Sequence, residues 1–137
     1  MSLHLIKLCV GCDTVDELIA WRDESRVVDQ PWILRTRQTP RRAPELVDGG
    51  SLYRVHKGFI LSRQAILAVN TVGEGPTKRC EVTLAEDVVF IAPTPRRPFQ
   101  GWRYLHPVDS PPDLDAAPGG QALPQALARR LREIGAW

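Results

Sequence analysis

The chain lacks any long hydrophobic run. In its 137 residues no stretch approaches the roughly 20 apolar residues that a membrane-spanning helix needs. The N-terminal residues are followed by an acidic segment rather than by a small-residue cleavage site, so they do not resemble a signal peptide. We therefore expect a cytoplasmic protein without a membrane partner.

The common catalytic signatures are also missing. The sequence has no glycine-rich phosphate loop, no GxSxG nucleophile elbow and no HExxH zinc motif. Their absence excludes the enzyme classes that carry these motifs and leaves open whether the protein is an enzyme. We expect no cofactor and no metal, and the catalytic residues, if there are any, stay unknown.

Cysteine is scarce, with three residues, but two of them form a CxxC motif, Cys9 and Cys12, just before a predicted helix. Such a motif is typical of a redox pair or of half a zinc site. The surrounding elements are not in a thioredoxin-like order, and the other possible zinc ligands have no second paired spacing: Cys80, His4, His56 and His106. The favoured interpretation is structural, with Cys9 a buried strand residue and Cys12 a small residue at a turn.

Turn residues and apolar patterns predict an α+β domain over residues 1–106. Strands are expected at 3–10, 32–36, 52–56, 58–61, 65–69, 80–84 and 88–91, and helices at 14–26 and 43–47. Many short strands separated by turns favour a mixed or partly closed β-barrel. Residues 107–122 form a Pro/Gly-rich linker, a possible binding segment for a protein partner, and 123–137 a last helix that packs back on the domain.

The net charge is only +2, but it is unevenly distributed. Residues 33–104 carry twelve Lys or Arg against six Asp or Glu, whereas the residues before them are acidic. This block contains two arginine-rich segments with aromatic residues, 32–42 and 93–104. Arginine binds phosphate bidentately and aromatic rings stack on bases, so the block favours a nucleic-acid partner.

Strand alternation places Arg35 with Arg37 on one face, and Trp102 with Tyr104 on another. The predicted nucleic-acid-binding residues are Arg35, Arg37, Arg41, Arg42, Lys57, Arg63, Gln64, Arg96, Arg97, Trp102 and Tyr104. Arg63 and Gln64 are expected to contact a base edge. The alternative is structural: the rings fill the end of the barrel and the arginines pair with Asp29, Glu45 and Asp48.

Three stretches, 32–42, 45–64 and 98–105, together with the N-terminal 3–11, resemble a bacterial family known only as a domain of unknown function. More loosely, the order of strand, arginine-rich turn, short helix, Gly-Gly and Lys-Gly is similar to the PUA/ASCH-like group. That resemblance implies a small β pseudo-barrel with flanking helices that binds RNA or modified bases. Some ASCH-type relatives are amidohydrolases that use a Lys, a Thr and a Glu, and the segment before Arg35 has no such Lys.

From these patterns we expect an RNA- or nucleotide-binding module. The alternative is a small hydrolase acting on a modified nucleoside or another small amide, with Lys57 as its reactive group. This alternative requires a carboxylate and a hydroxyl within hydrogen-bond reach of Lys57.

Overall fold

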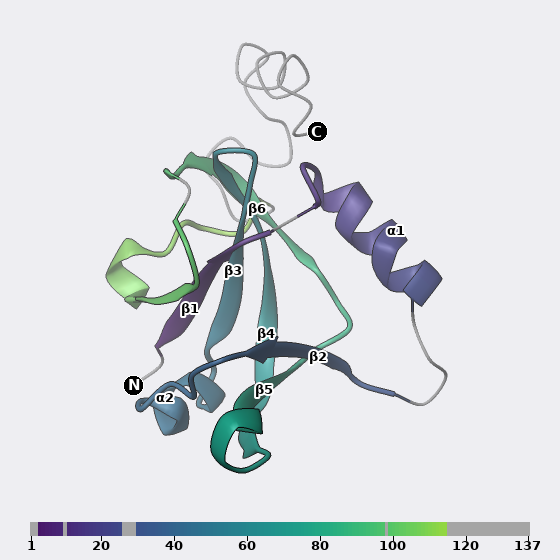
Figure 1. Ribbon diagram of the computed structural model, residues 1–137. Helices are drawn as coiled ribbons and strands as arrows, with labels where there is room; N and C mark the ends of the chain where they lie inside the picture. The colour runs from purple at the N-terminus through teal and green to yellow at the C-terminus, as the bar shows by residue number, and fades with distance from the viewer. Residues whose placement is uncertain (1–2, 10, 26–29, 98, 115–137) are drawn as a thin grey trace.

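A computed structural model describes residues 3–9, 11–25, 30–97 and 99–114 (Figure 1). The second half of the predicted linker and the predicted last helix, 123–137, lie outside these residues. None of the helices in the described ranges is long and apolar enough to cross a membrane.

A seven-stranded sheet dominates the fold, with strand order β2-β5-β4-β3-β1-β7 and β6 paired to β4. β1 pairs with β3 in parallel, and the other pairs are antiparallel. The sheet is mixed and open, so the prediction of a mixed, β-rich domain is confirmed at that level. The elements are β1 (His4–Leu8), α1 (Val15–Ser25), β2 (Trp32–Thr36), α2 (Ala43–Val47), β3 (Ser51–His56), β4 (Phe59–Val72), β5 (Arg79–Leu84), β6 (Val89–Pro95) and β7 (Trp102–Leu105), with short 3₁₀ turns at Gly75–Thr77 and Pro107–Asp109.

β4 corrects one prediction. Residues 58–61 and 65–69 were expected to form two strands, because three polar residues separate their apolar runs. They form one 14-residue strand instead, since two of those polar residues, Ser62 and Gln64, point into the protein and form hydrogen bonds there. The long strand contacts β3, β5 and β6, and therefore connects the whole sheet.

α1 begins where the capping pattern predicts. Thr14 Oγ1 accepts a hydrogen bond of 3.1 Å from the Glu17 backbone N–H, which satisfies one of the free donors at the helix N-terminus. Leu18 on the inner face joins the main core cluster together with Trp32 and Leu52. The helix is thereby fixed directly after the CxxC segment.

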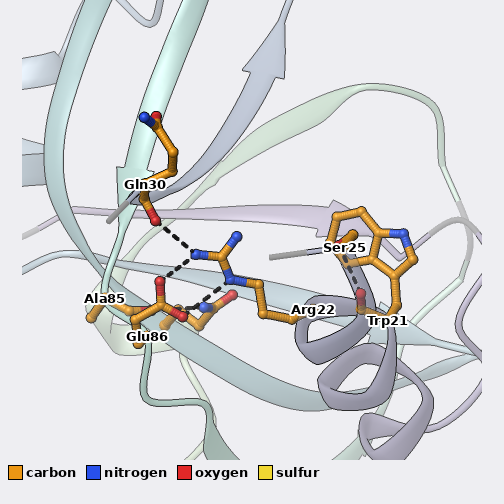
Figure 2. A network of polar contacts seen from close by, with 7 residues as sticks. Trp21, Arg22, Ser25, Gln30, Ala85 and Glu86 are labelled. Atoms are coloured by element: carbon orange, nitrogen blue, oxygen red, sulfur yellow. Dashed lines mark hydrogen bonds and ion pairs between the residues drawn. The ribbon is translucent and has the colours of Figure 1, made fainter. Parts of the chain in front are cut away.

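Arg22 attaches α1 to the sheet (Figure 2). Its guanidinium forms an ion pair with the Glu86 carboxylate and donates a 3.2 Å hydrogen bond to the Gln30 carbonyl. The same cation lies 5.1 Å from the centroid of the Trp32 ring. This buried, multiply bonded contact holds α1 over β2, and with it the cysteine loop that precedes the helix.

Candidate functional site

The two arginine-rich segments meet in one hollow of about 520 Å³. The hollow is lined by Arg35 of β2 and by Arg37, the residue that directly follows β2. Trp102 of β7 and Lys7 of β1 line the same hollow. β2 and β7 are the two ends of the strand order, so the hollow lies where the open edges of the sheet approach each other.

This hollow continues on both sides. A shallower one of about 330 Å³ shares Arg35 and Arg37 and adds Lys78 and Arg79. On the other side a pocket of about 440 Å³ shares Lys7 and Arg35 with the central hollow. We call the three hollows together the β2 groove. The last of them is called the disulfide pocket. It is lined by Lys7, Leu8, Cys9, Gly11, Cys12, Leu18, Trp21, Trp32, Ile33, Leu34, Arg35 and Arg54.

Several cations of the β2 groove are available to a ligand. Arg35 donates to the Glu81 carboxylate at 3.1 Å across the β2–β5 pair, and its side chain stays exposed. The side chains of Arg37 and Lys78 are exposed and form no hydrogen bond or ion pair with any other described residue. The groove therefore presents a net positive surface beside the Trp102 ring.

Trp102 and Tyr104 lie on the same side of β7, as the strand pattern predicts. Their rings meet edge to face with centroids 5.1 Å apart. The Tyr104 hydroxyl accepts a 3.1 Å hydrogen bond from the Arg42 backbone N–H, and the Arg42 guanidinium lies 5.7 Å from the Tyr104 ring centroid. Arg42 also pairs with Glu45, and this pairing holds the pKa of the Glu45 carboxyl below its usual value. Arg42 and Tyr104 are thus occupied with protein contacts, as the structural alternative predicts.

The other predicted arginines lie outside the three hollows. Arg41 is exposed beside α2. Arg96 lies 5.6 Å from the centroid of the Phe99 ring, which Arg103 also approaches to 5.2 Å. Arg97 is exposed next to them. These side chains do not share a hollow with Arg37 and Trp102.

Lys57 lies at the tip of the β3–β4 hairpin. It has a positive φ of 47° and an exposed side chain. It forms no hydrogen bond or ion pair with any described residue, so the carboxylate and hydroxyl that a hydrolytic centre requires are not bonded to it. The geometry gives no support to Lys57 as a reactive amine.

The prediction that Arg63 and Gln64 contact a base edge is wrong for Gln64. Its side chain is fully buried, its Nε2 donates to the Ala85 carbonyl at 2.8 Å, and its Oε1 accepts from Arg54. Arg63 is half-buried and donates to both carboxylate oxygens of Asp113 at 2.7 Å. The sequence pattern alone does not show which residues of a long strand are buried and which face solvent.

Cys9 and Cys12 form a disulfide, which the favoured structural interpretation did not predict. Cys12 is buried, with 7% of its surface exposed, whereas Cys9 is half-buried and lines the pocket. The His56 ring lies next to them: its Nδ1 is 3.2 Å from the Cys12 carbonyl oxygen and its Nε2 2.8 Å from Ser62 Oγ. Burial lowers the pKa of His56 to about 4, so the ring is neutral at pH 7.

One potential ligand atom each of Cys9, Cys12 and His56 lies within 4.8 Å of the others, and this is the one grouping of this kind among the described residues. In the disulfide form neither sulfur is a thiolate, the form of cysteine that binds metals, and both His56 nitrogens have hydrogen-bond partners, so the oxidised trio is a poor metal site. The sequence signal for this cluster was the CxxC motif. His56 joins it through the parallel pairing of β1 with β3, in which the Cys9 N–H donates to the Val55 carbonyl at 2.9 Å.

Arg54 completes the disulfide pocket from β3. Only 7% of its surface is exposed, and burial lowers the pKa of its guanidinium to about 10, so it remains a cation at pH 7. Its guanidinium donates to the Gln64 amide oxygen and lies 5.3 Å from the centroid of the Trp32 ring. No carboxylate among the described residues pairs with it. A buried cation without a counter-ion favours an anion in the pocket beside it.

Comparison with known protein families identifies the family of this chain. Residues 5–137 match the model of a family described as "Protein of unknown function (DUF1489)", and the chain belongs to that family. This confirms the resemblance to a domain-of-unknown-function family, whereas the PUA/ASCH-like similarity stays a prediction. No curated protein and no solved structure matches the chain.

Proposed function

We propose that this member of the DUF1489 family binds single-stranded RNA in the β2 groove. The observation that carries the proposal is that Arg37 and Trp102, one from each arginine-rich segment, line the same hollow. An arginine can bind a phosphate and an aromatic ring can stack on a base, so the two side chains in one hollow suit a single strand of RNA.

The contacts of the groove suggest how the strand would lie. Phosphates would follow Lys7, Arg35 and Arg37 across the central hollow and continue toward Lys78. A base would stack on the half-buried Trp102 ring, which meets the Tyr104 ring edge to face. The PUA-like character of the fold is part of this proposal, since a curved sheet with an open seam is a suitable platform for such a strand.

Fluorescence anisotropy with a labelled, mixed-sequence RNA of about ten nucleotides tests the proposal. Three phosphate contacts predict that log K falls with log salt concentration with a slope of roughly −2, at about −0.7 per phosphate on a single strand. Trp102→Ala should weaken binding by about 1–3 kcal/mol if a base stacks there. A DNA strand of the same sequence shows whether the 2′-hydroxyl contributes.

Arg41→Ala is the matched control for Arg37→Ala, because both remove one exposed arginine and only Arg37 lies in the groove. Arg37→Ala should weaken binding and reduce the salt slope by about 0.7, and Arg41→Ala should leave both nearly unchanged. No binding at low salt, or equal losses in the two variants, would contradict a site in the groove.

A further inference from the structure

We propose that Cys9 and Cys12 form a redox-active disulfide that exchanges with dithiols in the disulfide pocket, with Cys9 as the sulfur that the substrate attacks. The disulfide pocket adjoins the Arg37–Trp102 hollow, with which it shares Lys7 and Arg35, but the exchange at the two cysteines does not require RNA binding. Its substrate class is a dithiol, and its product the corresponding disulfide.

The two sulfurs differ in access as an exchange reaction requires. Cys9 is half-buried and Cys12 is 7% exposed, and both line a pocket of about 440 Å³ that opens to the surface. We therefore expect a thiolate entering the pocket to attack Cys9 Sγ, the sulfur of the more exposed residue. Trp21, which is 56% exposed, and the buried Trp32 give the pocket an apolar lining that fits the carbon chain of a dithiol.

The pocket also provides charge for the leaving sulfur. Breaking the disulfide places a negative charge on Cys12, and a nearby cation lowers the pKa of a thiol and stabilises its thiolate. Arg54 lines the same pocket, is almost fully buried, and has no carboxylate partner among the described residues. Reduction of the disulfide thus supplies the anion that this buried cation lacks.

One substrate thiolate attacks Cys9 Sγ, the Cys9–Cys12 bond breaks, and its electron pair leaves on Cys12 Sγ. The second substrate thiolate then attacks the substrate sulfur of the mixed disulfide, forms the substrate disulfide and releases Cys9 as a thiolate. The substrate loses two electrons and two protons, and the two cysteines gain two electrons and, on protonation, two protons.

The first experiment equilibrates the full-length protein with mixtures of reduced and oxidised dithiothreitol and counts the thiols trapped by a maleimide. We expect two thiols to appear together on a reversible two-electron curve, while the circular dichroism of the folded protein is kept. Arg54→Met should disfavour the reduced form about tenfold, equivalent to about 30 mV for a two-electron couple, and Arg54→Lys should restore most of this loss. Trp102→Ala should leave the curve unchanged, which separates this site from the proposed RNA site.

The second experiment uses Cys12→Ser and Cys9→Ser, which lose the same disulfide and therefore control for each other. With oxidised glutathione as probe, Cys12→Ser should form a mixed disulfide at Cys9, and Cys9→Ser should react far more slowly because Cys12 is buried. The pair keeps the proposal testable even where Arg54→Met does not fold. Three results would overturn it: equal reactivity of the two variants, reduction only after unfolding, or tight binding of one zinc ion by the reduced protein that blocks exchange.

Discussion

Acidification should destabilise the protein through His56. The imidazole is fully buried, and burial lowers its pKa from 6.5 to about 4, with the hydrogen bond to Cys12 and the charge of Asp13 opposing the shift. Because the folded-state pKa lies below the unfolded-state value, the unfolded chain binds the proton more readily. The stabilisation is therefore fully present above about pH 6.5 and is lost as the pH falls toward about 4.

The size of the effect follows from the shift. At 1.36 kcal/mol per pKa unit, the difference between 6.5 and about 4 corresponds to about 3 kcal/mol. Between about pH 6.5 and 5, where most carboxylates are still ionised, the loss is about 2 kcal/mol. His4, whose pKa burial and the Arg63 charge also lower, adds to the loss with the same sign.

Urea unfolding at pH 7, 6 and 5 measures this loss, with His56→Gln and the exposed His106→Gln as the test and its matched control. Between pH 7 and 5 the free energy of unfolding of the wild type and of His106→Gln should fall by about 2 kcal/mol. His56→Gln should be less stable than the wild type at pH 7, but its free energy of unfolding should fall clearly less over the same range. An unchanged pH dependence in His56→Gln would refute the reasoning. Where that variant does not fold, the NMR titration of His56 in the wild type serves instead, and a pKa above about 6 would contradict it.

Two substitutions in the protein interior should strongly lower the free energy of unfolding. Gln64→Leu removes the amide oxygen that accepts from the buried Arg54 guanidinium, and it should cost about 3 kcal/mol in urea unfolding, whereas Leu at the exposed Gln38 should cost less than about 0.5 kcal/mol. Gly50→Ala would place a Cβ 2.2 and 2.3 Å from two backbone carbonyl oxygens, and it should cost at least about 3 kcal/mol by thermal denaturation. Gly11→Ala, with nothing within 4 Å of its Cβ and only a positive φ to strain, should cost less; equal losses at the two glycines would show that the close approach is unimportant.

Much of the local structure could be predicted because turn residues separate the elements. β2 and α2 have the predicted bounds, since Pro31 precedes the strand, and Pro44 and Gly49 lie at the two ends of the helix. β4 could not be predicted as one strand, because its central polar residues Ser62 and Gln64 form hydrogen bonds with His56 on β3 and with the Ala85 carbonyl, and these partners come together only in the folded sheet.

The candidate RNA site and the cysteine cluster were predictable only in part, because long-range strand pairing brings their residues together. Arg37 and Trp102 were both identified from the sequence, but their convergence depends on β7 pairing with β1, almost a hundred residues away. Likewise, Cys9 and His56 are brought together by the parallel β1–β3 pair, which no local pattern reveals. Arg54 gave no sequence signal at all, since its burial, and the lack of a carboxylate partner for it among the described residues, become visible only in the folded protein.

The position of β1 in the sheet has a consequence for biosynthesis. β1 leaves the ribosome before the other strands of this sheet, and both of its hydrogen-bonded neighbours come later, β3 from Ser51 and β7 up to Leu105. Until they emerge, the strand edges and the cysteines that follow stay open to solvent, since long-range pairing is slow and requires the distant segments to be present. The nascent chain thus offers Cys9 and Cys12 as accessible thiols to oxidants and chaperones well before the pocket that later encloses them exists.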